Sequence, residues 1–229
     1  MYKEVIVISL GGSLIIPNAI DYRYLTKFRR ILLKNTKKYK FVVVCGGGNI
    51  AREYINALKK DNANETFQSF AGISATRTNA RFVSYLFRLN PNKGIPHTTN
   101  EVREYLKKQD VVFCGALEYH PNRTSDSTSA DLAKIFKGIF INLTNIKGIY
   151  SKNPLEYKDA KFIKEISWND FYKLANKKKF KPGQHFVLDQ HASKIIKENK
   201  ITTYVLGKDI KQLENVLNKK PFIGSTIKG

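Results

Sequence analysis

The chain has 229 residues, enough for one sizeable core or for two lobes that share a continuous sheet, but not for several independent domains. Hydrophobic residues make up 42% of the chain and aromatic residues 12%, a composition that excludes a disordered protein. A total of 40 lysines and arginines against 19 acidic residues gives a net charge of +21, which fits nucleic acid, an anionic membrane or small phosphorylated ligands without choosing among them.

Location and compartment follow from what the sequence lacks. No apolar stretch reaches the roughly 18 to 20 residues that a membrane-spanning helix needs. The first residues, Met1 to Glu4, carry no basic segment or cleavage site of a secretory signal. Cys45 and Cys114 end apolar runs and read as buried small hydrophobes, not as a disulfide framework. The sequence therefore predicts a soluble cytoplasmic protein without a membrane partner.

Predicted strands and helices alternate along the chain. Short runs rich in β-branched residues predict buried strands at Val5–Leu10, Phe41–Cys45, Val111–Cys114, Ile139–Leu143 and Thr202–Leu206. Spacing near 3.6 predicts helices at Tyr22–Lys34, Asn49–Lys60, Thr66–Leu89, Glu101–Lys108, Ser127–Phe136, Trp168–Asn176, Asp189–Glu198 and Ile210–Leu217. Such alternation is typical of an α/β protein, a three-layer α/β/α sandwich around a central, mostly parallel sheet.

Glycine-rich loops follow the first two predicted strands. The first strand ends in Gly11-Gly-Ser13 and the second in Gly46-Gly-Gly-Asn49. Glycine in a strand-to-helix turn lets backbone N–H groups approach a phosphate at the start of the helix. Since ligands of such sheets bind at the carboxyl ends of the strands, two loops of this kind indicate two phosphate-bearing ligands.

Several other nucleotide and metal signatures are missing. The chain has neither the Gly-Lys-Ser/Thr ending of a P-loop nor a GxGxxG turn, and it has no HExxH or paired-cysteine zinc pattern. Its four histidines do not form a metal-binding set. No resident metal site is expected, and a catalytic metal would arrive with a nucleotide. The lysine clusters lack interleaved aromatic residues, so nucleic acid is not an expected partner either.

Seven motifs, in order and spacing, carry a resemblance to a known family. They are Val7-Ile-Ser-Leu-Gly-Gly-Ser-Leu14, Gly46-Gly-Gly-Asn-Ile-Ala-Arg52, Gly72-Ile-Ser-Ala-Thr-Arg-Thr-Asn-Ala80, Thr124-Ser-Asp126, Thr144-Asn-Ile-Lys-Gly-Ile-Tyr150, Asp189-Gln-His-Ala-Ser-Lys194 and Gly224-Ser-Thr-Ile227. Across essentially the whole chain these residues resemble the amino acid kinase family, and within it the compact uridylate kinases. The resemblance implies one domain over 1–229, with an acceptor-binding part at about 1–135 and an ATP-binding part at about 136–229.

The resemblance also implies direct in-line transfer of a phosphoryl group from ATP to UMP, with Mg²⁺ as the accompanying cation. Arg52 and Asp126 would be the catalytic residues. The ATP-binding residues would be Gly12, Ser13, Gly48, Arg52, Thr144, Asn145, Tyr150 and Asn153. The UMP-binding residues would be Gly47, Ser69, Arg77, Thr124 and Ser125. Asp189 resembles a second carboxylate on the nucleotide side.

Each of these roles has a structural alternative. Arg52 could be a surface residue, and Arg77 could contact a neighbouring subunit instead of the acceptor. Thr124 to Asp126 could cap a helix, as could Asp189. Tyr150 could belong to the core. The family assembles through the helix that Thr66–Leu89 resembles, often as hexamers, so a homo-oligomer is expected.

The chain departs from the family pattern at several positions. Ser9 stands where many members have a lysine, and Ser69 where uridylate kinases place an aspartate near the acceptor ribose. Lys147 replaces an aspartate, and Asn153 replaces the aspartate of an Asp-Pro pair. The loop of residues 115–123 is about one residue longer than in the family. These differences leave two alternatives open: a different phosphate, carboxylate or carbamate acceptor, or a catalytically weak anion-binding protein.

Overall fold

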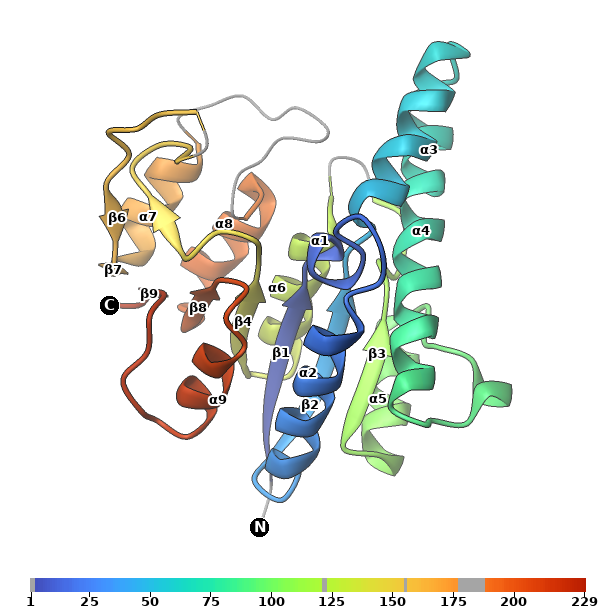
Figure 1. Ribbon diagram of the computed structural model, residues 1–229, viewed down its shortest axis with the longest axis horizontal. Coiled ribbons are helices and arrows are strands. Elements are labelled where there is room, and N and C mark those ends of the chain that lie inside the picture. The colour runs from blue at the N-terminus through green and yellow to red at the C-terminus, as the bar shows by residue number, and fades with distance from the viewer. Residues whose placement is uncertain (1–2, 121–122, 155, 177–187) are drawn as a thin grey trace.

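A mostly parallel sheet runs through the centre of the computed structural model, which describes residues 3–120, 123–154, 156–176 and 188–229 (Figure 1). Within these residues the sheet has the strand order β3-β2-β1-β4-β8-β9-β7. The strands are β1 Glu4–Leu10, β2 Tyr39–Cys45, β3 Val111–Cys114, β4 Ile139–Leu143, β7 Glu165–Ile166, β8 Thr203–Leu206 and β9 Ser225–Ile227. From β3 to β8 the strands are parallel, and β9 is antiparallel to β8. Because β4 pairs directly with β1, the sheet continues unbroken from the N-terminal to the C-terminal part of the chain.

Helices cover both faces of this sheet, as Figure 1 shows. The helical elements are α1 Gly12–Ile15, α2 Tyr22–Asn35, α3 Gly48–Lys60, α4 Glu65–Leu86, η1 Pro91–Lys93, α5 Thr99–Lys108, α6 Ser125–Ile135, α7 Trp168–Ala175, α8 Gln190–Glu198 and α9 Lys211–Leu217. None of the helices in the described ranges is both long and apolar enough to cross a membrane. The central sheet with helices on both faces confirms the predicted α/β/α sandwich.

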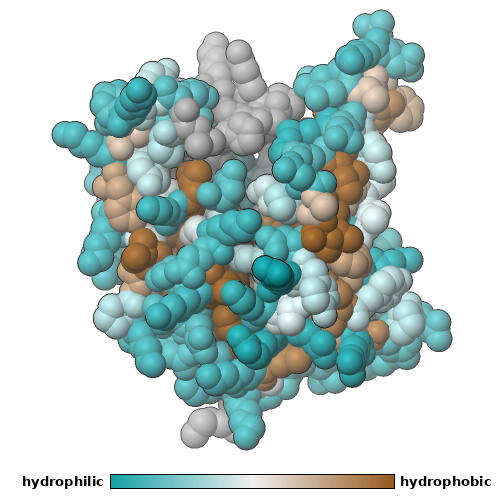
Figure 2. Space-filling view, viewed as in Figure 1, coloured by the Kyte–Doolittle hydropathy of each residue, from teal (hydrophilic) through white to brown (hydrophobic). Residues whose placement is uncertain are grey.

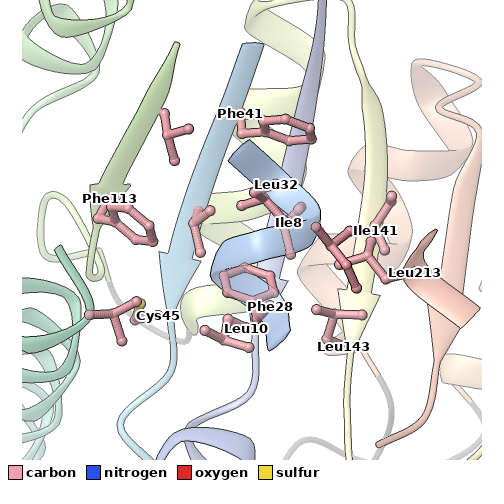
Figure 3. Packing of buried hydrophobic residues seen from close by; sticks show 14 of the residues in the cluster. Ile8, Leu10, Phe28, Leu32, Phe41, Cys45, Phe113, Ile141, Leu143 and Leu213 are labelled. Atoms are coloured by element: carbon pink, nitrogen blue, oxygen red, sulfur yellow. The ribbon is translucent and has the colours of Figure 1, made fainter. Parts of the chain in front are cut away.

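Alternating side chains divide the core into two layers. In β1, Ile6, Ile8 and Leu10 face α2, α4 and α9, where they pack with residues such as Phe28 and Leu213 (Figure 3). Val7 faces the opposite layer, formed with α5, α6, α7 and α8. Strands buried on both sides need apolar residues at nearly every position, which explains the continuous runs seen in the sequence.

The shortest elements were not predicted. They are β5 Ile149–Tyr150 and β6 Phe162–Ile163, which pair as an antiparallel hairpin, together with β7, β9, α1 and η1. Each has two to four residues. Such lengths are too short to show a period of 2 or 3.6.

Part of α3 and α4 projects from the body at the upper right of Figure 1. We call residues 53–74 the α3–α4 arm; they include no buried residue. Tyr54, Phe67 and Phe70 are exposed there, by 51%, 63% and 48%. Figure 2 shows hydrophobic surface along this projection. A projecting pair of helices with exposed aromatic side chains is typical of a surface that another chain covers.

Candidate active site

The two glycine loops touch each other. Leu10 and Cys45 are register partners in the parallel pair of β1 and β2, so the loops that follow leave the sheet side by side. A Cβ atom added to Gly12 would lie 2.2 Å from the amide nitrogen of Gly48. Gly48 itself has a φ of +62°, in the region that favours glycine. Neither position has room for a side chain, and the two backbones form one continuous surface.

Helix α3 begins at this contact. Its N-cap residue is Gly47, which provides no side-chain cap, so the first N–H groups of the helix are available to an anion. Asn49 donates from Nδ2 to the carbonyl of Pro17 over 2.8 Å, and it accepts a hydrogen bond from Arg52. Arg52 is therefore held on the second turn of α3, near the loops. Its guanidinium supplies a positive charge beside the free N–H groups.

Asp126 lies in the first turn of α6 and faces Ser9 of β1. The buried hydroxyl of Ser9, which is 2% exposed, donates to Oδ1 of Asp126 over 2.8 Å. The pKa of Asp126 is raised to about 7, mainly by burial and in addition by the neighbouring Asp189, while the Ser9 hydrogen bond opposes both effects. Asp126 is thus a carboxyl group that changes charge near neutral pH.

Asp189 joins the starts of two helices. It is the N-cap of α8 and accepts from the amide of Ala192 over 2.7 Å. It also accepts from the hydroxyl of Thr124, the N-cap of α6, and from the hydroxyl of Ser127 over 2.8 Å. Thr124 and Asp189 therefore both cap helices, as the structural alternative given for them has it. The positive ends of α6 and α8 are directed to the same place, which favours negative charge there.

Helix α4 holds the loops from the side. Asn79, which is 2% exposed, donates to the carbonyl of Gly46 over 2.8 Å. Thr76 accepts from the amide of Ala116 over 2.9 Å. Arg77 donates to the carbonyls of Ala116 and Leu117. These hydrogen bonds fix the loop after β3 to α4. The guanidinium of Arg77 is used to hold this loop.

Two further residues predicted to bind the acceptor, Ser69 and Ser125, are half-buried. Ser69 is half-buried on α4, beside Phe70, whose ring packs against that of Tyr119 at 5.1 Å between centroids. Ser125 is half-buried as the first residue of α6, and its carbonyl accepts from Ser129. The contact between Phe70 and Tyr119 joins α4 to the long loop of residues 115–123, of which residues 121–122 lie outside the described ranges.

On the opposite side, Thr144 and Asn145 follow β4. Gly11 donates to the carbonyl of Leu143 over 3.0 Å, which brings the first glycine loop next to this turn. Tyr150 lies in β5, and its ring packs edge-on against Phe162 at 5.4 Å. Asn153 donates to Glu156 over 2.8 Å in the following turn. The observed partners of Tyr150 and Asn153 are thus Phe162 and Glu156, in and next to the β5–β6 hairpin.

Sequence reasoning missed three residues that shape the site. It treated Ser9 only as a missing lysine, and it assigned no role to Asn79. Ser225 is fully buried in β9 and accepts from the amide of Ile149 over 2.7 Å, so it holds the start of β5. Buried polar residues need partners, and a lone polar residue inside an apolar strand is the signal that could have identified Ser9 and Ser225.

Metal-binding groups are few. No cluster of three or more His, Cys, Asp or Glu side chains suited to a metal is found in the part of the chain that the structure describes. Asp126 fits a shared role, because Mg²⁺ is commonly held by one or two carboxylates together with phosphate oxygens of the substrate.

Touching glycine loops, a free helix N-terminus and a paired carboxylate at one edge of a parallel sheet define an α/β phosphate-binding protein. The model of the amino acid kinase family matches residues 4–207. The chain belongs to this family.

The relatives and the fold agree with that assignment. A uridylate kinase of Pyrococcus abyssi is 33% identical over 221 residues, covering 94% of this chain and 96% of the relative. A uridylate kinase of Thermoplasma volcanium is 34% identical over 227 residues, covering 98% of each. The crystal structure of uridylate kinase from Archaeoglobus fulgidus superposes with a TM-score of 0.84 at 31% identity, covering 97% of this chain and 99% of that one.

Proposed function

We propose that the protein is a UMP kinase, which transfers the γ-phosphoryl group of ATP to UMP and releases ADP and UDP. The observation that carries this proposal is the direct contact between Gly12 and Gly48. Two phosphate-binding loops in contact can hold two phosphorylated ligands close enough for in-line transfer. The named relatives, similar over nearly their whole length, indicate UMP as the acceptor.

Positioning and charge neutralisation supply most of the catalysis in such a reaction. The backbone N–H groups at Gly12 and at the start of α3 bind phosphate oxygens, and Arg52 adds a guanidinium suited to two oxygens at once. Asp126, held by Ser9, fits as a ligand of the Mg²⁺ that accompanies ATP. When bound, that ion offsets the negative charge of the phosphates.

The two ligands occupy opposite sides of the glycine loops in this proposal. ATP contacts Gly12, Ser13, Gly48 and Arg52 at the glycine loops and Thr144, Asn145, Tyr150 and Asn153 in the part of the chain from about residue 136 onward. UMP contacts Gly47, Ser69, Arg77, Thr124 and Ser125. The hydrogen bonds from Arg77 to Ala116 and Leu117 support a role in shaping the acceptor side.

A homo-oligomer accompanies this activity. The exposed aromatic residues of the α3–α4 arm support assembly through these helices, and a hexamer is the form that the family resemblance predicts. The cytoplasm is the location that we propose together with this activity.

The test is ADP release from ATP and Mg²⁺ in parallel reactions with UMP, CMP, dUMP, carbamate or no acceptor. UMP is expected to raise ADP release at least about 100-fold over the reaction without acceptor. Stimulation by carbamate alone would reassign the acceptor, in keeping with Ser69 in place of an aspartate. No stimulation by any of the acceptors would contradict the kinase assignment.

A further inference from the structure

A groove lies between α2 and α9, on the face of the sheet that points toward the viewer in Figure 1. Its volume is about 530 Å³, within the range of small-ligand sites. Lys27, Arg30 and Lys34 of α2 line it, together with Lys211 of α9. None of the residues that line the groove belongs to the site described above.

The positive charges on α2 form a stripe. Arg23, Lys27, Arg30 and Lys34 are four, three and four residues apart, so they share one face of the helix over about 16 Å. Helix α2 contains no acidic residue that could offset them. Like charges at this spacing destabilise a helix, which favours a role for the stripe in binding an anion.

The carboxylates of the groove are already engaged. Glu214 pairs with Lys34 over 3.1 Å. Asp209 accepts from the amide of Lys211 over 3.1 Å and from Gln212 over 2.6 Å, at the start of α9. Within the described ranges, the side chains of Lys27, Arg30 and Lys211 form no ion pair. The lining therefore carries four cations against two carboxylates, and three of the cations have no ion-pair partner of their own among the described residues.

A second hollow continues the groove along α2. It has a volume of about 300 Å³, shares Lys27 and Arg30 with the first, and adds Arg23 and the exposed ring of Tyr22. Two apolar residues, Ile31 and Ile210, also line the first hollow. In Figure 2 the face that carries α2 and α9 is mostly hydrophilic. The surface thus suits an elongated anion with several charges better than a single phosphate group.

We propose that the α2–α9 groove binds a multiply charged phosphate chain, such as that of a nucleoside triphosphate or of inorganic polyphosphate, outside the reaction centre. Lys27, Arg30 and Lys211 bind the chain, and Arg23 extends its path. Several adjacent cations bind a chain of linked phosphates more tightly than separate phosphates, because the covalent links hold the charges at high local concentration.

The groove can be observed directly by NMR on the full-length protein with ¹³C-labelled isoleucine methyl groups, because Ile31 and Ile210 line it. Inorganic tripolyphosphate is expected to shift both resonances, and the affinity is expected to fall between about 50 and about 300 mM salt. The double variant Lys27→Glu/Arg30→Glu is expected to bind at least about tenfold more weakly.

The matched control is Lys37→Glu/Lys38→Glu. These two exposed lysines follow α2, lie outside the groove lining and give the same change in net charge. The control is expected to stay within about threefold of the parent, because neither lysine lines the groove and the attraction of charges outside it is weakened by salt screening. Turnover of UMP, measured separately, is expected to be unchanged in both double variants.

A parallel titration with UTP distinguishes the two sources of the ligand. Tighter binding of UTP than of tripolyphosphate at Ile31 and Ile210 assigns the groove to nucleotides, and equal binding assigns it to the phosphate chain alone. The proposal is wrong if tripolyphosphate leaves both methyl groups unshifted, or if both double variants weaken it equally. It is also wrong if a short RNA shifts these resonances and tripolyphosphate does not. None of these outcomes depends on kinase activity.

Discussion

The reaction centre and the α3–α4 arm lie next to each other in the chain but are stabilised in opposite ways. At the centre, Ser9 is 2% exposed, and Gly12 and Gly48 touch. In the arm, residues 53–74 include no buried residue, and Phe67 is 63% exposed. The geometry of the centre is thus determined inside one subunit. If a second copy of the chain covers the arm, as proposed above, the effects of changes in the arm should depend on protein concentration, and those of changes at the centre should not.

The largest effect is expected from Gly48→Ala. The new Cβ would lie 2.8 Å from the carbonyl carbon of Gly12, and the φ of +62° would strain any side chain. We expect kcat/KM to fall at least about 100-fold, because the two loops must separate. Steady-state kinetics at several protein concentrations measure this loss.

Gly94→Ala is the matched control for this change. Gly94 has a similar φ of +67°, but an added Cβ would meet only the end of the Arg81 side chain, at 3.6 Å. We expect a cost of about 1 kcal/mol in the free energy of unfolding and no loss of turnover. Equal losses of activity in the two variants would show that backbone strain, and not contact between the loops, is what matters.

The second effect concerns Asp126→Asn and the dependence of stability on pH. The pKa of Asp126 in the folded protein is about 7, above its ordinary value of 3.8. The contribution of Asp126 to the free energy of unfolding is therefore fully present below about pH 4 and is lost as the pH rises through about 7. Asparagine does not ionise, so the variant does not lose stability in this way. We expect the variant to gain stability relative to the parent, by up to roughly 4 kcal/mol at pH 8, while its kinase activity falls sharply.

Urea denaturation from about pH 5 to about pH 8 measures the difference in unfolding free energy between Asp126→Asn and the parent. The difference should increase with pH. A difference that stays constant across this range would mean that Asp126 does not titrate within it.

A smaller effect is expected from Ser9→Ala. The hydroxyl of Ser9 donates to Asp126 and lowers the pKa of that carboxyl group, so its loss raises the pKa further. If the ionised form is active, the acidic limb of the kcat profile should move to higher pH by about 0.5 to 1 unit. The plateau should change little. A lower plateau without a shift of the limb would indicate a packing defect instead.

The smallest effect on kcat is expected from Tyr54→Ser/Phe67→Ser in the arm. Neither side chain is buried in the subunit, so we expect turnover at high protein concentration to stay within about threefold while the oligomer dissociates to smaller species. Light scattering measures the mass. Ile223→Ser, at a residue 62% exposed outside the arm, is the control and should leave the mass unchanged. A monomeric parent protein would contradict the assembly proposal.

The longer elements of the fold could be predicted from the sequence. The five predicted strands coincide with β1, β2, β3, β4 and β8 to within two residues at each end. Strands buried on both faces have a distinctive composition, and helices such as α2 have a clear apolar stripe. The hairpin of β5 and β6 could not be predicted, because pairing over two residues depends on neighbours such as Ser225.

By itself, the sequence determined the fold class, the two glycine loops and the family, because these depend on residue types at short and regular spacing. Only the tertiary structure decided that the loops touch, that Arg77 holds the loop after β3, and that Ser9 is the partner of Asp126. Ser9 and Asp126 are 117 residues apart in the chain. A hydrogen bond between them leaves no periodic pattern, and it forms only because β1 and α6 pack together in the folded core.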